Sequence, residues 1–181
     1  MDTSTHNTIL HTARLTLRPL TVDDAAFIMA LVNDPDWLHF IGSRDVHSLD
    51  DARRYIQDGP MVSYVQHGFG MYLTERTEDG TPLGLCGLIR RDTLPDIDIG
   101  YAFLPASRGH GYAREATQSM LHHAQHTLKL TRLLAITSPD NQRSIRLLEH
   151  IGMTYERDLM LPGDDELTSL FSISFMNASQ S

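Results

Sequence analysis

The sequence predicts an α/β protein, of the α+β kind, in which a mixed sheet of about seven strands is flanked by about four helices. Stretches that alternate apolar and polar residues, which is typical of strands, are interspersed with stretches whose apolar residues recur every three or four positions, which is typical of helices. Their order is β-α-α-β-β-β-α-β-α-β-β, which favours one sheet with helices on its faces. The 181 residues fit a single domain of ordinary size.

The first half of the chain supplies strands and two helices. Thr21 and Asp24 form a capping-box pattern at the start of the first helix, and Asn33-Asp34-Pro35 ends it. Gly59-Pro60 stops the second helix, which begins at Ser48. A polar turn joins the last two strands into a hairpin. In order, the predicted elements are a strand at 13–20, helices at 21–32 and 48–56, and strands at 69–76 and 82–90.

The second half alternates strands with amphipathic helices. In its first helix Ala116, Met120 and Ala124 recur on one face, which is expected to pack on the sheet. Gly152 closes the second helix, and a Pro-Gly-Asp-Asp turn joins the last two strands. In order, the predicted elements are a strand at 96–104, a helix at 111–128, a strand at 132–137, a helix at 141–151, and strands at 153–160 and 167–175.

Composition excludes several classes of protein. Acidic residues outnumber basic ones by 23 to 15, the formal net charge is −8, and the basic residues are scattered. Nucleic acid is therefore not expected as a partner, whereas a cationic ligand such as an amine is mildly favoured. The N-terminus lacks the pattern of a signal peptide, and no run of about 18 apolar residues occurs. We expect a cytoplasmic protein without a membrane segment.

We expect one domain over 12–176, with polar tails at 1–11 and 177–181. Cys86 is the only cysteine and lies in an apolar run, so we expect a core thiol, no internal disulfide and a reducing compartment. His122 and His126 lie one helical turn apart, but no third ligand is apparent and a metalloprotease motif would have glutamate at residue 123. No metal is expected.

The stretch from Arg108 to Ala113 follows a predicted strand and a proline, and it opens a helix. Its glycines, Gly109 and Gly111, lack a Cβ atom, so a ligand can approach the backbone closely. The free amides at the helix start would bind an anion such as a diphosphate. The dinucleotide fingerprint would need a third glycine where Arg114 stands and an acidic residue about 20 positions further on, so that class is disfavoured.

The pattern Arg108-x-x-Gly111-x-Ala113 resembles the acetyl-CoA pyrophosphate loop of the GNAT family of N-acetyltransferases. Three other stretches are similar to the Rim-type branch, and they lie at 14–20, 98–101 and 141–153. The resemblance covers nearly the whole chain. It implies a mostly antiparallel sheet and acetyl-CoA as acetyl donor. The acceptor would be a primary amine, either a ribosomal-protein N-terminal amine or a small amine such as a polyamine, an aminoglycoside or an amino acid; a homodimer is compatible with it.

The resemblance also implies a cofactor site. Main-chain groups of two strand residues would pair with the pantetheine arm, and the amides of the glycine loop would hold the pyrophosphate, with an arginine supplying positive charge. Asn141 would contact the cofactor arm, or it would only cap its own helix. The residues implied are Phe103, Leu104, Arg108, Gly109, His110, Gly111, Tyr112, Ala113 and Asn141.

Asp98 is the leading candidate for the general base. By strand parity, Asp96 and Asp98 share the face opposite Ile97 and Ile99, and a polar face in a central strand suggests a cleft. The alternatives are that both aspartates only face solvent, or that Glu75 is the base. An α-amine with a pKa of ~7.8 is roughly one-seventh neutral at pH 7, so such an acceptor would tolerate a weak base.

Ser144 is the candidate for orienting or protonating the departing thiolate. GNAT members commonly have a tyrosine acid seven residues after the helix asparagine, but that position is Leu148 here. A thiol with a pKa of ~8.5 leaves without much protonation, so the departure is tolerable. Ser144 lies one turn from Asn141 and is found in Rim-type relatives, although it would otherwise contact the cofactor arm or bond a helix carbonyl.

We therefore expect direct transfer in a ternary complex rather than a covalent intermediate on Cys86, since nothing nearby in the sequence activates that thiol. A catalytically silent acyl-CoA-binding protein stays open as an alternative. The acceptor is expected to be bound by the first two predicted helices and by the loop that carries Trp37, His39, Phe40 and Arg44.

Overall fold

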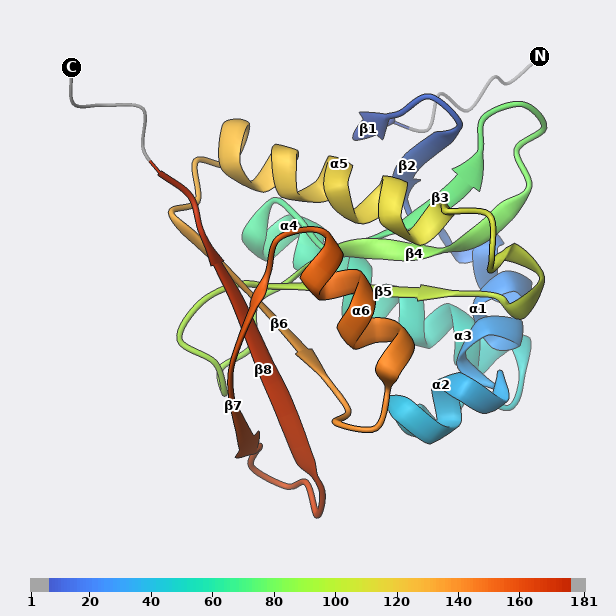
Figure 1. Cartoon of the computed structure of the whole chain (residues 1–181). Helices are drawn as coiled ribbons and strands as arrows, with labels where there is room; N and C mark the ends of the chain where they lie inside the picture. The colour runs from blue at the N-terminus through green and yellow to red at the C-terminus, as the bar shows by residue number, and fades with distance from the viewer. Residues whose placement is uncertain (1–6, 177–181) are drawn as a thin grey trace.

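The computed structural model describes residues 7–176, so residues 1–6 of the expected N-terminal tail and all of the expected C-terminal tail, 177–181, lie outside it. One eight-stranded sheet forms the centre, in the order β1-β2-β3-β4-β5-β6-β8-β7 (Figure 1). Only β5 and β6 are parallel, so the prediction of a mixed, mostly antiparallel sheet is confirmed. The strands are β1 (Leu10–His11), β2 (Leu15–Pro19), β3 (Met71–Arg76), β4 (Pro82–Ile89), β5 (Asp98–Phe103), β6 (Arg132–Thr137), β7 (Thr154–Met160) and β8 (Leu167–Ser174).

The strand that the sequence did not predict is β1. Its residue Leu10 pairs with Leu17 of β2, so residues 10 and 11, which were placed in the N-terminal tail, belong to the sheet. A strand of two residues is too short to show an alternating pattern, and only its pairing with β2 defines it. The sheet therefore begins two residues before the expected boundary at residue 12.

Helices cover both faces of the sheet (Figure 1). Buried residues of α5 and α6 pack on one face, together with Tyr72 and Phe103. Buried residues of α1, α2 and α3 pack on the other face, together with Leu73 and Leu85. The helices are α1 (Ala25–Val32), α2 (Pro35–Phe40), α3 (Leu49–Ile56), α4 (Val62–His67), α5 (Tyr112–His126) and α6 (Gln142–His150), with short helices η1 (Val22–Asp24), η2 (Gln57–Met61) and η3 (Pro105–Ser107).

The predicted loop around Trp37 is a helix, α2, which is a correction. Asp34 is its N-cap residue and Pro35 its first residue. A proline at the first helical position loses no hydrogen bond, and its fixed φ suits a helix, so here it begins a helix as well as following one. Trp37 is buried against the same core as α1 and α3.

The helix beginning after Ser48 does not stop at Gly59-Pro60, which is a second correction. The chain continues through the π turn η2, which contains Pro60, into α4. The irregular turn accommodates a residue that has no N–H and would distort a regular α-helix. Gly68, with φ 75°, ends α4 in the left-handed conformation. No helix within residues 7–176 is long and apolar enough to cross a membrane.

The feature that positions the site is a gap in the sheet between β5 and β6. The two strands share a single register pair, Asp98 with Leu134, and the amide of Leu134 donates to the carbonyl of Ile97 at 2.9 Å. Beyond Asp98 the strands part. The C-terminal half of β5 therefore presents its edge to an opening inside the sheet instead of to a neighbouring strand.

Candidate active site

A cavity of about 970 Å³ lies at this gap. Its walls come from α2, β5, the loop before α5, the start of α6 and the loop between β7 and β8. All the site residues predicted from the sequence line it except Leu104 and His110; those that do are Asp98, Phe103, Arg108, Gly109, Gly111, Tyr112, Ala113, Asn141 and Ser144. The structure therefore brings residues from three separate segments of the chain to one opening.

The glycine loop has the backbone conformation that its sequence predicts. Gly109 and Gly111 have φ values of 78° and 79°, in the left-handed region that other residues avoid. Gly111 is the N-cap residue of α5, and no side chain of the described part of the chain caps that helix. The N–H groups of the first turn of α5 therefore point out of the helix without an internal acceptor, and they can bind an anion.

Arg108 does not point its charge at this loop, which corrects its expected role. Its guanidinium donates to Asp36 at 2.7 Å and to Asp34 at 3.0 Å, and to the carbonyl of Phe103 at 3.0 Å. Two carboxylates therefore neutralise it and hold it towards α2. The side chain joins the loop to α2 rather than supplying free positive charge to a pyrophosphate.

Arg14 is the guanidinium that lies against the glycine loop, and sequence reasoning missed it. It donates to the carbonyl of His110 at 2.9 Å and lies over the ring of Tyr112, with 4.6 Å between the guanidinium carbon and the ring centre. Glu115 pairs with it at 2.7 Å. No sequence signal links Arg14 to a loop 96 residues away, because β2 reaches α5 only in the folded chain. His110 contributes its carbonyl to this contact, and its side chain does not line the cavity.

Leu104 cannot pair with a pantetheine arm as the resemblance implied. Its N–H donates to Leu83 of β4 and its carbonyl accepts from Ser107, each at 2.9 Å. In an antiparallel ladder, residues that bond to the neighbouring strand alternate with residues whose main-chain groups point away from it. Because Leu104 bonds to β4, every second residue before it also faces β4, and the residues between them face away. Given the β4–β5 register, the main-chain groups of Ile99, Tyr101 and Phe103 face the gap. The N–H of Phe103 and the main-chain groups of Tyr101 therefore face the gap, whereas the N–H of Leu104 is bonded to β4.

Asp98 lies in the cavity wall with a perturbed carboxyl group. It is 1% exposed, and Nε of Arg91 contacts its two oxygens at 3.0 and 3.2 Å. Burial raises the pKa of Asp98 to about 6, although the nearby Arg91 charge opposes the rise. At neutral pH the group is mostly ionised and can accept a proton. Asp96 differs: it pairs with Arg132 at 3.0 Å, outside the residues that line the cavity.

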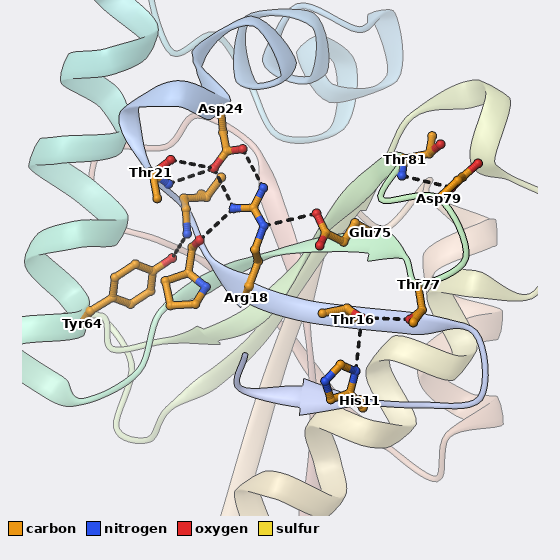
Figure 2. Close-up of polar contacts among 12 residues, drawn as sticks. His11, Thr16, Arg18, Thr21, Asp24, Tyr64, Glu75, Thr77, Asp79 and Thr81 are labelled. Carbon is orange, nitrogen blue, oxygen red and sulfur yellow. Dashed lines mark hydrogen bonds and ion pairs between the residues drawn. The ribbon is translucent and has the colours of Figure 1, made fainter. Parts of the chain in front are cut away.

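Glu75, the alternative base, is excluded by its position. It accepts from Nε of Arg18 at 3.2 Å in a group that also contains Asp24, and Figure 2 shows the arginine held between the two carboxylates. The residues that line the cavity do not include it. Glu75 is therefore a partner in a structural ion-pair group.

The start of α6 brings Asn141 and Ser144 to the cavity. The Asn141 side-chain oxygen accepts from the amide of Ser144 at 3.1 Å, so Asn141 caps its own helix. The Ser144 hydroxyl lies 2.7 Å from the Tyr101 hydroxyl. Burial raises the pKa of Tyr101 to about 12, against the opposing effect of the Ser144 hydrogen bond. Leu148 is buried in the core and is not among the residues that line the cavity.

Two further parts of the cavity lining are α2 and the loop between β7 and β8. Trp37, His39, Phe40 and Arg44, which were predicted near the acceptor, all line the cavity. Asp164, Asp165 and Glu166 line it as well, although the sequence showed them only as part of a turn. Cys86 does not line it; burial raises the pKa of its thiol well above the usual range, which makes it a poor nucleophile.

Comparison with known proteins supports an acyltransferase. A model of the acetyltransferase (GNAT) domain matches residues 14–154. YkkB of Bacillus subtilis is 29% identical over 156 residues, covering 84% of this chain and 88% of that protein. An acetyltransferase structure from Agrobacterium tumefaciens has a TM-score of 0.78 at 26% identity, covering 93% and 94% of the two chains.

RimL, a ribosomal L7/L12 α-N-protein acetyltransferase, has the same fold, with a TM-score of 0.78 at 18% identity over 93% of this chain and 94% of its own. RimL has also been solved with coenzyme A. The domain match spans most of the chain and the fold agrees with it. The chain therefore belongs to the GNAT family of acetyltransferases.

Proposed function

We propose that this protein transfers the acetyl group of acetyl-CoA directly to the N-terminal α-amine of a protein or peptide. The observation that carries the proposal is that one cavity is lined by the glycine loop, by α2 and by the carboxyl group of Asp98. Donor and acceptor can then occupy the same opening together. Direct transfer needs no enzyme nucleophile, which agrees with the buried position of Cys86.

Asp98 would act as the base. The amine nitrogen attacks the thioester carbonyl, and Asp98 takes the proton that the nitrogen loses. Main-chain N–H groups of β5 that face the gap would stabilise the oxyanion. The C–S bond then breaks, and the departing thiolate accepts a hydrogen bond from Ser144. The amides of Gly109 to Ala113 would hold the pyrophosphate.

The basicity of Asp98 favours an α-amine as acceptor. A carboxylate with a pKa of about 6 is a weak base. An α-amine with a pKa of ~7.8 loses its proton to such a base far more readily than a lysine amine with a pKa of ~10.4. The similarity of fold to RimL supports the same acceptor class.

A small polycationic amine is the second candidate acceptor. Asp164, Asp165 and Glu166, from the loop between β7 and β8, are among the residues that line the cavity. Their carboxylates would attract a polyamine or an aminoglycoside through long-range electrostatics. Both candidates place a primary amine at Asp98, so they differ only in what holds the rest of the acceptor.

Release of free thiol from acetyl-CoA distinguishes these acceptors. The panel contains a peptide with a free N-terminus, the same peptide with its N-terminus blocked and an internal lysine retained, spermidine, and an aminoglycoside. We expect turnover with the free N-terminus and loss of that turnover when it is blocked. Turnover with spermidine alone would favour the small-amine acceptor.

Two further readouts test the mechanism. Double-reciprocal plots against both substrates should intersect, as a ternary complex requires, whereas parallel lines would indicate a covalent intermediate. Acetyl-CoA should raise the melting temperature because it binds the folded protein. A raised melting temperature with no thiol from any acceptor would contradict the proposed transferase activity.

A further inference from the structure

We propose that Tyr101 is a positioning residue for the reaction and aims the hydroxyl of Ser144 at the sulfur of coenzyme A. The inference rests on the proposed function, because it gives Ser144 a partner in stabilising the departing thiolate. Tyr101 belongs to β5 and Ser144 to α6, 43 residues apart in sequence, and both line the cavity.

The distances define which group can orient the other. The Tyr101 oxygen lies 2.7 Å from Ser144 Oγ and 3.3 Å from the Ser144 carbonyl. A tyrosine hydroxyl has a single hydrogen to donate, as does a serine hydroxyl. If Tyr101 donates to Ser144 Oγ, the serine hydrogen must point elsewhere, and it becomes available to an atom in the cavity.

The packing of the half-buried Tyr101 ring makes this arrangement specific. The ring packs against the core on the α5 side of the sheet, which limits how far its hydroxyl can move away from Ser144. The Ser144 hydroxyl is less constrained, because a helix serine can also bond a carbonyl in the preceding turn of its own helix. Tyr101 gives the Ser144 hydroxyl another hydrogen-bond partner, and this contact holds the Ser144 hydroxyl at the opening between β5 and α6.

The proposal also accounts for Leu148. That side chain is buried with the core, and α6 therefore offers no tyrosine to the cavity from that position. A tyrosine hydroxyl reaches the start of α6 from β5 instead. The gap between β5 and β6 allows this approach, because Tyr101 lies on the part of β5 that does not pair with β6.

The step needs no proton from Tyr101. The thiolate forms when the C–S bond breaks, and it accepts a hydrogen bond from Ser144 Oγ–H while Tyr101 O–H donates to Ser144 Oγ. Each hydrogen stays on its own oxygen, and solvent later protonates the thiolate. The low acidity of the half-buried tyrosine suits a donor that must not lose its proton. Donors in such a chain strengthen one another as negative charge develops at its end.

The first test uses free coenzyme A and needs no acceptor. The ionisation of the bound thiol is followed by thiolate absorbance against pH, with desulfo coenzyme A as the blank. We expect the wild-type protein to lower the thiol pKa below its usual ~8.5. Tyr101→Phe and Ser144→Ala should each raise the thiol pKa of the complex by about one unit, a tenfold change, since a hydrogen bond to a charged group is worth roughly that much.

The second test is a double-mutant cycle on turnover. Tyr101→Phe should lower kcat about tenfold while the KM for acetyl-CoA stays within about twofold. In a Ser144→Ala background the same change should have little further effect, because the tyrosine acts through the serine. Tyr72→Phe is the matched control. Tyr72 is buried and lies outside the cavity lining, so kcat should be unchanged.

The outcomes separate this inference from the proposed function. Additive losses in the double variant, or a thiol pKa that Tyr101→Phe leaves unchanged, would overturn the role of Tyr101. If Tyr101→Phe lowered the melting temperature without changing kcat, the contact would only stabilise the fold. Absence of turnover in the wild-type protein would count against the proposed function alone, since the thiol titration still decides the role of Tyr101.

Discussion

The Arg18 group, with Asp24 and Glu75, and the Arg91–Asp98 pair differ in how completely their carboxylates are satisfied. Arg18 donates to both oxygens of Asp24, to Glu75 and to the carbonyl of Pro19 (Figure 2). Asp24 also accepts from the amide of Thr21 at 2.8 Å, which closes a capping box. Asp98, by contrast, has one nitrogen of Arg91 against its two oxygens and faces a cavity.

The difference appears in the ionisation of the two groups. Burial opposes the charge on Arg18, but Asp24 and Glu75 outweigh it and the pKa of Arg18 is raised. For Asp98, burial outweighs Arg91 and the carboxyl pKa rises to about 6. A saturated pair stays ionised and stabilises the fold, whereas an incompletely paired carboxylate at a cavity can exchange a proton near neutral pH. Only the second group has the properties of a catalytic site.

The largest expected effect is on turnover in Asp98→Asn. If Asp98 is the base, kcat at pH 7 should fall roughly 100-fold or more, in the range typical of lost general-base catalysis. Asp96→Asn is the control, because Asp96 lies just before the start of β5 and pairs with Arg132 outside the cavity lining. Both variants are compared by thiol release at saturating substrates. An Asp98→Asn protein with more than half of the wild-type kcat would remove Asp98 from the mechanism.

Asp24→Ala should produce the largest loss of stability. It leaves a largely buried Arg18 with fewer partners, and breaking such a pair typically lowers the free energy of unfolding by roughly 3–5 kcal/mol. Urea denaturation measures the loss. The specific activity of the folded fraction should stay within about twofold of wild type. A large loss of turnover without a loss of stability would mean that the Arg18 group takes part in catalysis instead of only stabilising the fold.

The pH dependence sharpens the comparison further. Below about pH 6, where Asp98 takes up a proton, kcat at saturating acceptor should fall about tenfold per pH unit, and Asp98→Asn should lack this limb. The folded pKa of Asp98 is raised, so its carboxylate form costs stability as pH increases from about 4 to about 6. The stability of Asp98→Asn relative to wild type should therefore rise over that window and level off above it. Urea midpoints across pH 4–8 test the sign.

A smaller effect is expected from paired glycine substitutions. Gly109 and Gly80 have φ values of 78° and 69°, and a Cβ at either would meet no atom within 4 Å. Alanine should therefore cost each site a similar ~1–2 kcal/mol of backbone strain. Only Gly109→Ala should also weaken acetyl-CoA binding, because its loop lines the cavity. Equal affinity of both variants for acetyl-CoA in calorimetry would argue against the glycine loop as the anion site.

The smallest effect is expected for Glu75→Gln. Arg18 keeps both oxygens of Asp24 in that variant, so the free energy of unfolding should change by about 1 kcal/mol or less. Turnover should equal that of wild type, since Glu75 lies outside the cavity lining. A large loss of kcat would restore Glu75 as a candidate base.

The sequence by itself determined the features that depend on near neighbours in the chain. Alternating and helical periods predicted the order of the main strands and helices, and the glycines at 109 and 111 predicted a loop with left-handed backbone in front of a helix. These signals are local, because side-chain period and backbone conformation follow from a few consecutive residues. Strand parity likewise placed Ile99, Tyr101 and Phe103 together in one core cluster.

The tertiary structure decided which groups meet. Arg108 turned to Asp34 and Asp36, more than 70 residues away, and the register with β4 occupied the amide of Leu104. The sequence predicts Tyr101 only as a core residue. In the folded chain β5 separates from β6, and the Tyr101 hydroxyl lies beside Ser144. Hydrogen-bond partners and pKa shifts depend on register, packing and burial, and these arise only when distant segments of the chain come together.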